Sequence, residues 1–205
     1  MVRCDIGSAS NAISAQIFKT LAEIMTDFTE YYHLEKYIRG KVNRNFHQDG
    51  FINAEDFFCI VIWKANRAKS KIAKLLLKFE PDLELCCKNL TSKLFKAELP
   101  KERLEILIKE YGFRLPMASA ILSILYPKEF SVYDYRVCEI LTQFADLINL
   151  TAFENIWKGY NSYLKAVNEC TNPDLNLTQK DHYLWGKSFY NQLQLNIKSN
   201  FKQKL

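Results

Sequence analysis

The sequence is poor in the residues that interrupt regular structure. Glycine occurs 6 times and proline 5 times in 205 residues, which is too few for the many turns of a β-sandwich or β-barrel. Apolar residues recur instead at the three- and four-residue spacing of a buried helix face. With 48% hydrophobic and 14% aromatic residues, the chain can bury a sizeable core. We therefore expect a folded all-α protein, built as one domain or as two small lobes.

Three further features are missing. No uninterrupted apolar run reaches the roughly 18 residues of a membrane span, and the first residues lack the basic, apolar and small-residue succession of a signal peptide. These absences predict a soluble cytoplasmic protein that does not contact a membrane. The six cysteines form no CxxC pair, and several lie in apolar helical stretches, where free cysteine behaves as a small hydrophobe. We expect a monomer without a metal ion, a cofactor or a disulfide framework.

Positive charge is concentrated in one segment. Over the chain, Lys and Arg outnumber Asp and Glu by 28 to 23, which permits a polyanionic partner without requiring one. Residues 64–78 contain no acid but six cations, namely Lys64, Arg67, Lys69, Lys71, Lys74 and Lys78. Because Ile72, Leu75 and Leu76 fit the buried stripe of a helix, a basic run alone is more simply a solvated helix face.

Most of the chain has the pattern of helices separated by short breaks. Ser10 or Asn11 is a suitable cap for a first long helix that ends near Gly40, and residues 41–50 form the best internal loop. Asn53 is placed to cap a second, central helix that is apolar on nearly all sides over residues 57–63. Further helices are expected over residues 83–97, from Pro100 to Tyr111, and over about 152–169 and 178–197.

The segment Tyr111–Arg136, YGFRLPMASAILSILYPKEFSVYDYR, combines a turn, an apolar helix and an acid. Gly112 and Pro116 mark the turn, since proline costs least near the first position of a helix. After the break at Tyr126 and Pro127, an apolar approach leads to Asp134 at the start of another helix. Taken alone, Asp134 is most simply the N-cap of that helix.

This segment resembles the helix-hairpin-helix DNA glycosylase superfamily. The family's hairpin reads roughly LPGVGxxTAxxxL, and its essential aspartate lies in a V-D-x-x-V context. The corresponding segments here are YGFRLPMA (111–118) and VYDYRV (132–137), and Asp134 lies 16 positions after Ala118, which is similar to the family's own spacing. The segment IWKANR (62–67) is similar to the one in which a family Asn or Gln fills the gap left by a flipped nucleotide. The matched segments lie within residues 62–137, a span of about a third of the chain.

The resemblance implies a two-lobed all-α fold with a cleft between the lobes. One lobe would comprise residues 1–52 and 126–205, and the other residues 53–125, with the helix-hairpin-helix over about 101–125. It implies a glycosylase that flips a damaged or modified base out of duplex DNA. In a bacterium, such an enzyme would be associated with the nucleoid. Alternatives are a DNA-binding hairpin protein without catalysis and an all-α interaction protein without nucleic acid.

The resemblance also implies roles for individual residues. Asp134 would stabilise the oxocarbenium ion and position water. Pro116 stands where bifunctional members carry a lysine, which implies a monofunctional enzyme without strand cleavage. Cys170 is alone where some members carry an iron-sulfur loop, and Arg114 replaces the hairpin's second glycine. The implied DNA-binding residues are Asn66, Arg67, Lys64, Lys69, Lys71, Lys109, Gly112 and Arg114, and the implied base-pocket residues are Trp63, Tyr133, Tyr135 and Trp185.

Overall fold

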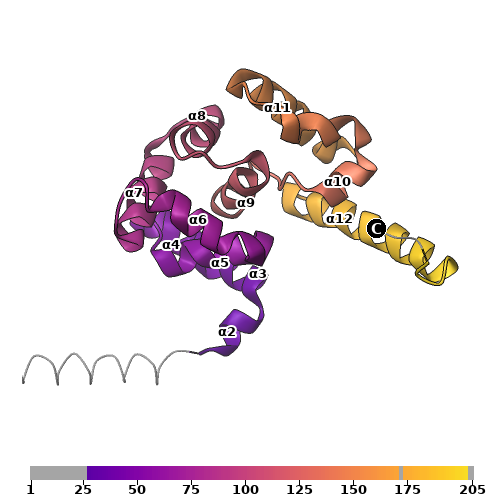
Figure 1. Ribbon diagram of the computed structural model, residues 1–205, viewed down its shortest axis with the longest axis horizontal. Helices are drawn as coiled ribbons and strands as arrows, with labels where there is room; N and C mark the ends of the chain where they lie inside the picture. Colours follow the sequence, from indigo (N-terminus) through magenta and orange to yellow (C-terminus); the bar gives the residue numbers. More distant parts are fainter. Residues whose placement is uncertain (1–26, 171–172, 203–205) are drawn as a thin grey trace, which may run out of the picture. The chain divides into compact units, whose positions relative to one another are not determined.

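The computed structural model describes residues 27–170 and 173–202. Within these residues the regular structure is entirely helical, which confirms the expected all-α class (Figure 1). The chain divides into two compact units, residues 1–34 and 35–205. Of the first unit, only residues 27–34 are described, and they contain the short helix α2 (Thr29–Tyr32). The proposed caps Ser10 and Asn11 lie outside the described residues, and the predicted division into two lobes stays a prediction.

The predicted helix stop at Gly40 is wrong. Helix α3 (Leu34–Tyr37) continues into η1 (Ile38–Val42), a π-helical turn, and then into α4 (Asn43–Asp49). The stop is Gly50, whose φ of +77° lies in the left-handed region that favours glycine. The predicted loop over residues 41–50 is therefore helical. Val42 and Phe46 explain this result, because they are four residues apart and both fully buried, which anchors one face of an otherwise polar helix.

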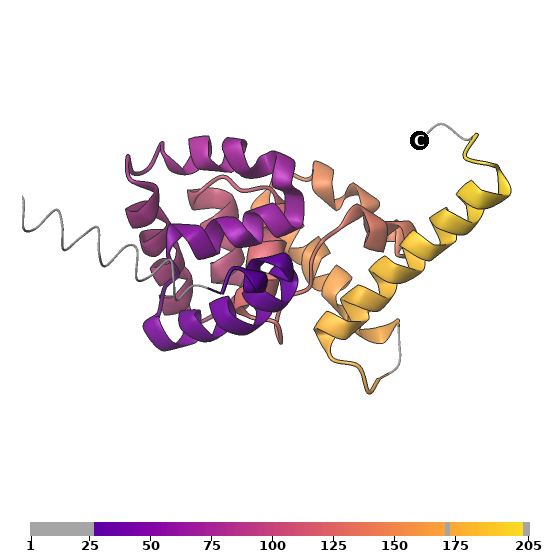
Figure 2. The same ribbon diagram turned by 90° about the horizontal axis from the view of Figure 1, so that it is seen from below.

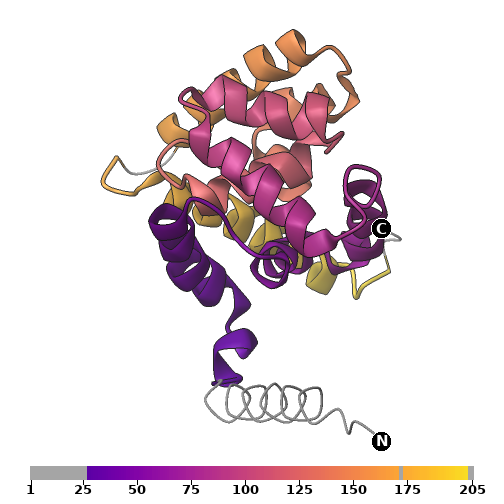
Figure 3. The same ribbon diagram turned by 90° about the vertical axis from the view of Figure 1, so that its left-hand side faces the viewer.

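Helix α5 (Ala54–Ala65) is the central helix that the apolar run predicted. It packs against η1, α6 (Lys69–Leu76), α7 (Leu83–Lys96) and α9 (Leu115–Leu125). Figure 3 shows these helices from the side on which α7 lies. Phe57, Ile60 and Val61 are fully buried, and burying each contributes about 2 kcal/mol. The short η2 (Asn66–Ala68) links α5 to α6.

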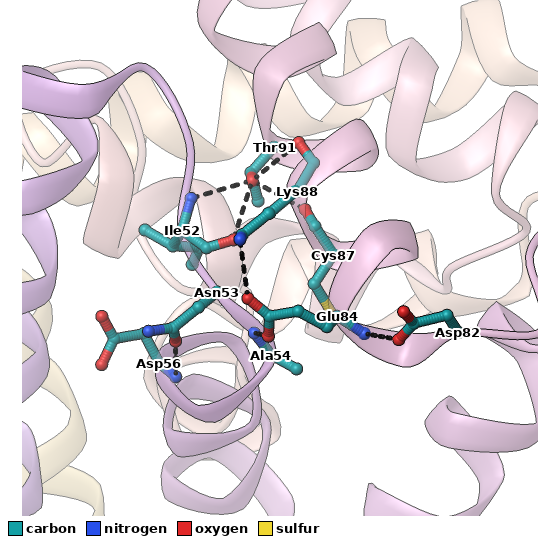
Figure 4. Close-up of polar contacts among 9 residues, drawn as sticks. All are labelled: Ile52, Asn53, Ala54, Asp56, Asp82, Glu84, Cys87, Lys88 and Thr91. Atoms are coloured by element: carbon teal, nitrogen blue, oxygen red, sulfur yellow. Dashed lines mark hydrogen bonds and ion pairs between the residues drawn. The ribbon is translucent and has the colours of Figure 1, made fainter. Parts of the chain in front are cut away.

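Polar contacts tie the beginning of α5 to α7 (Figure 4). The side chain of Asn53 accepts a hydrogen bond from the backbone N–H of Asp56 at 2.8 Å, and Glu84 accepts one from the N–H of Ala54 at 2.8 Å. The hydroxyl of Thr91 contacts the chain just before the helix. These contacts satisfy N–H groups that a helix start leaves free. Because its start is fixed, α5 places its last residues at a defined position.

A tight turn joins the next two helical segments. Helix α8 (Pro100–Glu105) runs into η3 (Ile106–Glu110), and residues 111–114 lead to α9. Gly112 has a φ of +71°, a conformation in which any Cβ is strained. The N–H of Phe113 donates to the carbonyl of Leu107 at 2.9 Å and closes the turn. The turn predicted at Gly112 is present, and α9 packs back against α8 and η3.

The last elements form a separate layer of this unit. They are α10 (Tyr135–Ile140), η4 (Thr142–Asn149), α11 (Phe153–Glu169) and α12 (Leu177–Lys198). Helix α12 lies against α10 and α11, and its C-terminal end extends beyond them (Figure 2). Its buried residues are Lys180, Asp181, Leu184 and Ser188, and none follows Ser188. Across residues 27–170 and 173–202, every helix is too short or too polar to cross a bilayer.

Candidate functional site

Asp134 lies at the N-cap of α10, as its sequence position predicts. One carboxylate oxygen, Oδ1, accepts a hydrogen bond from the backbone N–H of Arg136 at 3.0 Å. The other, Oδ2, is ion-paired with the Nζ atom of Lys64 at the end of α5. The side chains of Lys64 and Asp134 are only 11% and 18% exposed. Asp134 is therefore both a helix cap and one half of a largely buried ion pair.

The extended segment before Asp134 is held from two helices. The N–H of Tyr133 donates to the Ser119 hydroxyl of α9 at 2.9 Å. The hydroxyl of Tyr163, on α11, donates to the carbonyl of Val132 at 2.7 Å. These bonds fix the backbone on both sides of the chain, so the carboxylate of Asp134 is preorganised rather than carried on a free loop.

A cavity of about 430 Å³ opens beside this ion pair and is called the Asp134 cavity below. Its volume lies in the range of small-molecule sites. Lys64 and Asp134 line it together with Trp63 from α5 and Trp185 from α12. The structure thus brings the catalytic candidate together with two of the four aromatic residues proposed for a base pocket.

The other two aromatic residues lie elsewhere. Tyr133 and Tyr135 line a second cavity of about 480 Å³, which also contains Lys64 and Asp134. Tyr133 is buried, its hydroxyl donates to the carbonyl of Phe144 at 2.8 Å, and burial raises the pKa of that hydroxyl. Tyr135 is 63% exposed. The four aromatic residues therefore divide between two cavities that share the ion pair.

The rim of the Asp134 cavity carries a charged cluster that the sequence does not reveal. Glu35 Oε1 lies 2.8 Å from both Nε of Arg39 and Nε2 of His182. The hydrogen bond from His182 and the neighbouring Arg39 guanidinium lower the pKa of Glu35 to about 2, although burial opposes the shift. The same guanidinium lies 5.2 Å from the centre of the Trp63 ring. Arg39 and His182 are 143 residues apart in sequence, so no local pattern links them.

Asp181 is a second carboxyl group lining the Asp134 cavity, and it too was missed. The residue is 6% exposed, and burial raises the pKa of its carboxyl from 3.8 to about 6. In the sequence it is only an acid near the start of a helix, a common position with a simple explanation. Its position in the Asp134 cavity results from the packing of α12 against the other helices, which the sequence does not show.

A second concave surface, the basic groove, lies between α6 and residues 111–114. Its volume is about 940 Å³, and no acidic residue lines it. The groove brings together five of the predicted DNA-binding residues and adds two lysines, so that its cations and glycine are Lys64, Arg67, Lys71, Lys74, Lys78, Gly112 and Arg114. Lys64 lines both the basic groove and the Asp134 cavity.

Helical spacing explains which cations face the basic groove. Arg67, Lys71, Lys74 and Lys78 are spaced i, i+4, i+7 and i+11, the period of one helix face. Lys71 and Lys74 lie on α6, and Arg67 in η2 and Lys78 just after α6 line the groove with them. This spacing could have identified Lys74 and Lys78 from the sequence. Lys69 lies off that face and instead donates to the side chain of its neighbour in η2 at 3.0 Å.

Three predicted DNA-binding residues do not line the groove. Lys69 is one of them. Asn66 is exposed where the backbone bends between α5 and α6, and its side-chain oxygen accepts the hydrogen bond from Lys69. Lys109, on η3, is ion-paired with Glu105 at 2.7 Å. The structure therefore gives Asn66 and Lys109 partners within their own helical segments.

No metal centre and no known relative guides the interpretation of these surfaces. The part of the chain that the structure describes contains no group of three or more His, Cys, Asp or Glu residues able to hold a metal ion. Comparisons with protein-family models, with curated proteins and with solved structures found no match. Functional inference therefore depends on the residues and their geometry.

Proposed function

We propose that this protein is a monofunctional DNA glycosylase that removes a damaged or otherwise modified base from duplex DNA. The observation that carries the proposal is the position of Lys64. This residue lies where an acid-free basic groove adjoins a cavity that holds a carboxylate and two tryptophans. A surface that binds the phosphate backbone is thereby continuous with a chamber of suitable size for one nucleobase.

The basic groove supplies what backbone binding requires. Arg67, Lys71 and Arg114 make no ion pair with the residues in the described ranges, so their charges are available to phosphate oxygens. Phosphate contacts position a protein on the duplex without reading sequence. The start of α9 follows Arg114 directly, and a helix N-terminus favours an anion. Arg114, in place of the family's second glycine, adds a cation to this wall of the groove.

The Asp134 cavity supplies the chemistry. A base in a duplex must be extruded before a side chain can reach its glycosidic bond. Trp63 and Trp185 would then stack on the extruded base. Asp134, already fixed by the cap and the Lys64 ion pair, would stabilise the positive charge that develops on the sugar as the bond breaks. It would also orient the attacking water.

The same ion pair supports the assignment as monofunctional. Strand cleavage by this type of enzyme needs an amine with a free electron pair to attack the sugar. Pro116 occupies the position of the family lysine. The amine that the structure places beside Asp134 is that of Lys64, and it is held in an ion pair with the carboxylate. An intact abasic strand is the expected product.

A panel of modified duplexes tests this function. Duplexes bearing one oxidised, alkylated, deaminated or enzymatically decorated base are incubated with the protein and then treated with hot alkali. We expect cleavage at the modified position only after alkali. Cleavage before alkali would contradict the monofunctional assignment. If the protein bound every duplex and cleaved none, the binding-only alternative would replace the glycosylase.

Neutralising the basic groove is expected to weaken DNA binding and its salt dependence. Each of Lys71→Ala and Arg114→Ala should reduce the slope of log K against log salt by about 1, because each removes one phosphate contact. Fluorescence anisotropy with an unmodified duplex over a salt series measures this slope. Lys165→Ala is the matched control, since Lys165 is exposed on α11 and does not line the groove. An absence of binding at low salt would favour a protein that does not bind nucleic acid.

A further inference from the structure

Asp181 is the least expected charged residue of the Asp134 cavity. Its surface is only 6% exposed, and it lines the same cavity as Asp134 and Lys64. Within the described chain no cation lies within ion-pairing distance of its carboxyl group. A buried carboxyl without an ion-pair partner is costly to keep ionised, so a packing role alone does not explain an aspartate at this position.

Charged and titratable groups surround Asp181 from every neighbouring element. Arg39 from η1 and Lys64 from α5 favour its ionised form, as does His182 on its own helix. From α11, the hydroxyl groups of Tyr160 and Tyr163 lie near enough to interact electrostatically with it, but both donate to backbone carbonyls and remain protonated because burial raises their pKa values. The remaining carboxylates of the cavity are Glu35 and Asp134. The effect of burial on the pKa of Asp181 exceeds that of these cations, so the pKa is raised to about 6.

We propose that Asp181 is the general acid that protonates the departing base, while Asp134 stabilises the sugar. This proposal rests on the glycosylase function and extends it to a second carboxyl group on a different helix. Of the three carboxyl groups that line the cavity, Glu35 and Asp134 are ion-paired and Asp181 is not. Where the surroundings of two carboxyl groups differ in this way, one group can act as the acid and the other can stabilise positive charge.

The reaction balances with these two groups and one water molecule. The C1′–N bond breaks with its electron pair moving to the base, and the proton of Asp181 moves to a ring nitrogen or carbonyl oxygen of the base. The resulting oxocarbenium ion lies against the carboxylate of Asp134. Water adds to C1′ and gives its proton to Asp134. Exchange with solvent then moves one proton from Asp134 and returns one to Asp181, so that one water is consumed.

A general acid narrows the class of substrate. An uncharged base leaves as a poor anionic leaving group unless it is protonated, whereas a cationic alkylated base leaves as a neutral molecule without help. Asp181 is therefore of use for an uncharged modified base that presents a proton acceptor. We therefore expect uncharged modified bases, rather than cationic ones, to be the substrates of this cavity.

Single-turnover excision separates this role from a structural one. The probes are duplexes bearing uracil, hypoxanthine or 8-oxoguanine as uncharged bases and 7-methylguanine as a cationic base. For an uncharged base, the parent enzyme should slow about tenfold per pH unit above about pH 6. Asp181→Asn should slow excision about a hundredfold at pH 6 and remove that pH dependence. Asp181→Glu should restore part of both, and circular dichroism checks that each variant is folded.

The outcomes distinguish the inference from the function on which it rests. If the parent enzyme excises an uncharged base and Asp181→Asn does so at a similar rate with the same pH profile, Asp181 is not the acid and the glycosylase assignment stands. Excision of 7-methylguanine alone also overturns the role of Asp181 but not the glycosylase. If the parent enzyme excises none of the probes, nor any base of the wider panel, both proposals are overturned.

Discussion

Asp134→Asn is expected to abolish base excision while the fold and DNA binding are retained. Asparagine is as good an N-cap as aspartate, and its side-chain oxygen can still accept the hydrogen bond from the N–H of Arg136. What it lacks is the negative charge that pairs with Lys64 and that would lie opposite the developing oxocarbenium ion. Losing a preorganised electrostatic partner of this kind costs roughly a thousandfold in rate, which corresponds to about 4 kcal/mol of transition-state stabilisation.

A second capping aspartate provides the matched control for this variant. Asp82 caps α7 by accepting from the N–H of Glu84 at 2.8 Å, and it does not line the Asp134 cavity. Asp82→Asn should therefore excise the base at the parent rate. Single-turnover excision and duplex binding are measured for both variants. If Asp134→Asn excised within tenfold of the parent rate, Asp134 would be a cap only, and its catalytic role would be overturned.

The sequence predicted those elements whose determinants are local. The apolar run after Asn53 predicted α5, and the cap itself is present in the structure. The stripes over 152–169 and 178–197 match α11 and α12 closely. Gly112 was recognised as a turn because it follows one apolar stripe and precedes a proline. The predicted helix end at Gly40 is wrong because a glycine ends a helix where its backbone is left-handed, as at Gly50. The buried side chains of Val42 and Phe46 stabilise the helix between these two glycines.

The candidate site was only partly predictable, for a physical reason. Asp134 and Trp63 were identified from segments that resemble a family, and each segment is continuous. The Lys64–Asp134 ion pair joins residues 70 positions apart, and Asp181 approaches from a still later helix. Such contacts are decided by how α5, α10 and α12 pack, and no spacing along the chain encodes them. Lys64 was predicted to bind DNA as one of a basic run, whereas its side chain is turned towards the carboxylate.

The proposed chemistry requires a buried aspartate, Asp181, whose ionised form destabilises the folded protein. This effect on stability can be measured without DNA. Burial raises the pKa of Asp181 from 3.8 to about 6 in the folded protein. Between these values the folded state binds a proton more tightly than the unfolded chain does. The penalty for burying Asp181 is therefore absent below about pH 4, grows between about pH 4 and pH 6, and is complete above about pH 6.

Asp181→Asn is accordingly expected to be more stable than the parent protein at pH 8, and to lose this advantage as the pH is lowered to 4. The shift from 3.8 to about 6, at about 1.4 kcal/mol per pKa unit, corresponds to a free-energy difference of about 3 kcal/mol. Urea unfolding of both proteins between pH 4 and pH 8 measures it. Asp146→Asn is the control, because Asp146 is exposed on η4 and does not line the Asp134 cavity. A flat difference for Asp181→Asn would show that this carboxyl titrates alike in the folded and unfolded chain. If the stability difference between Asp181→Asn and the parent increased with pH, it would show, without any substrate, that the ionised Asp181 destabilises the folded protein and that the fold favours its protonated form.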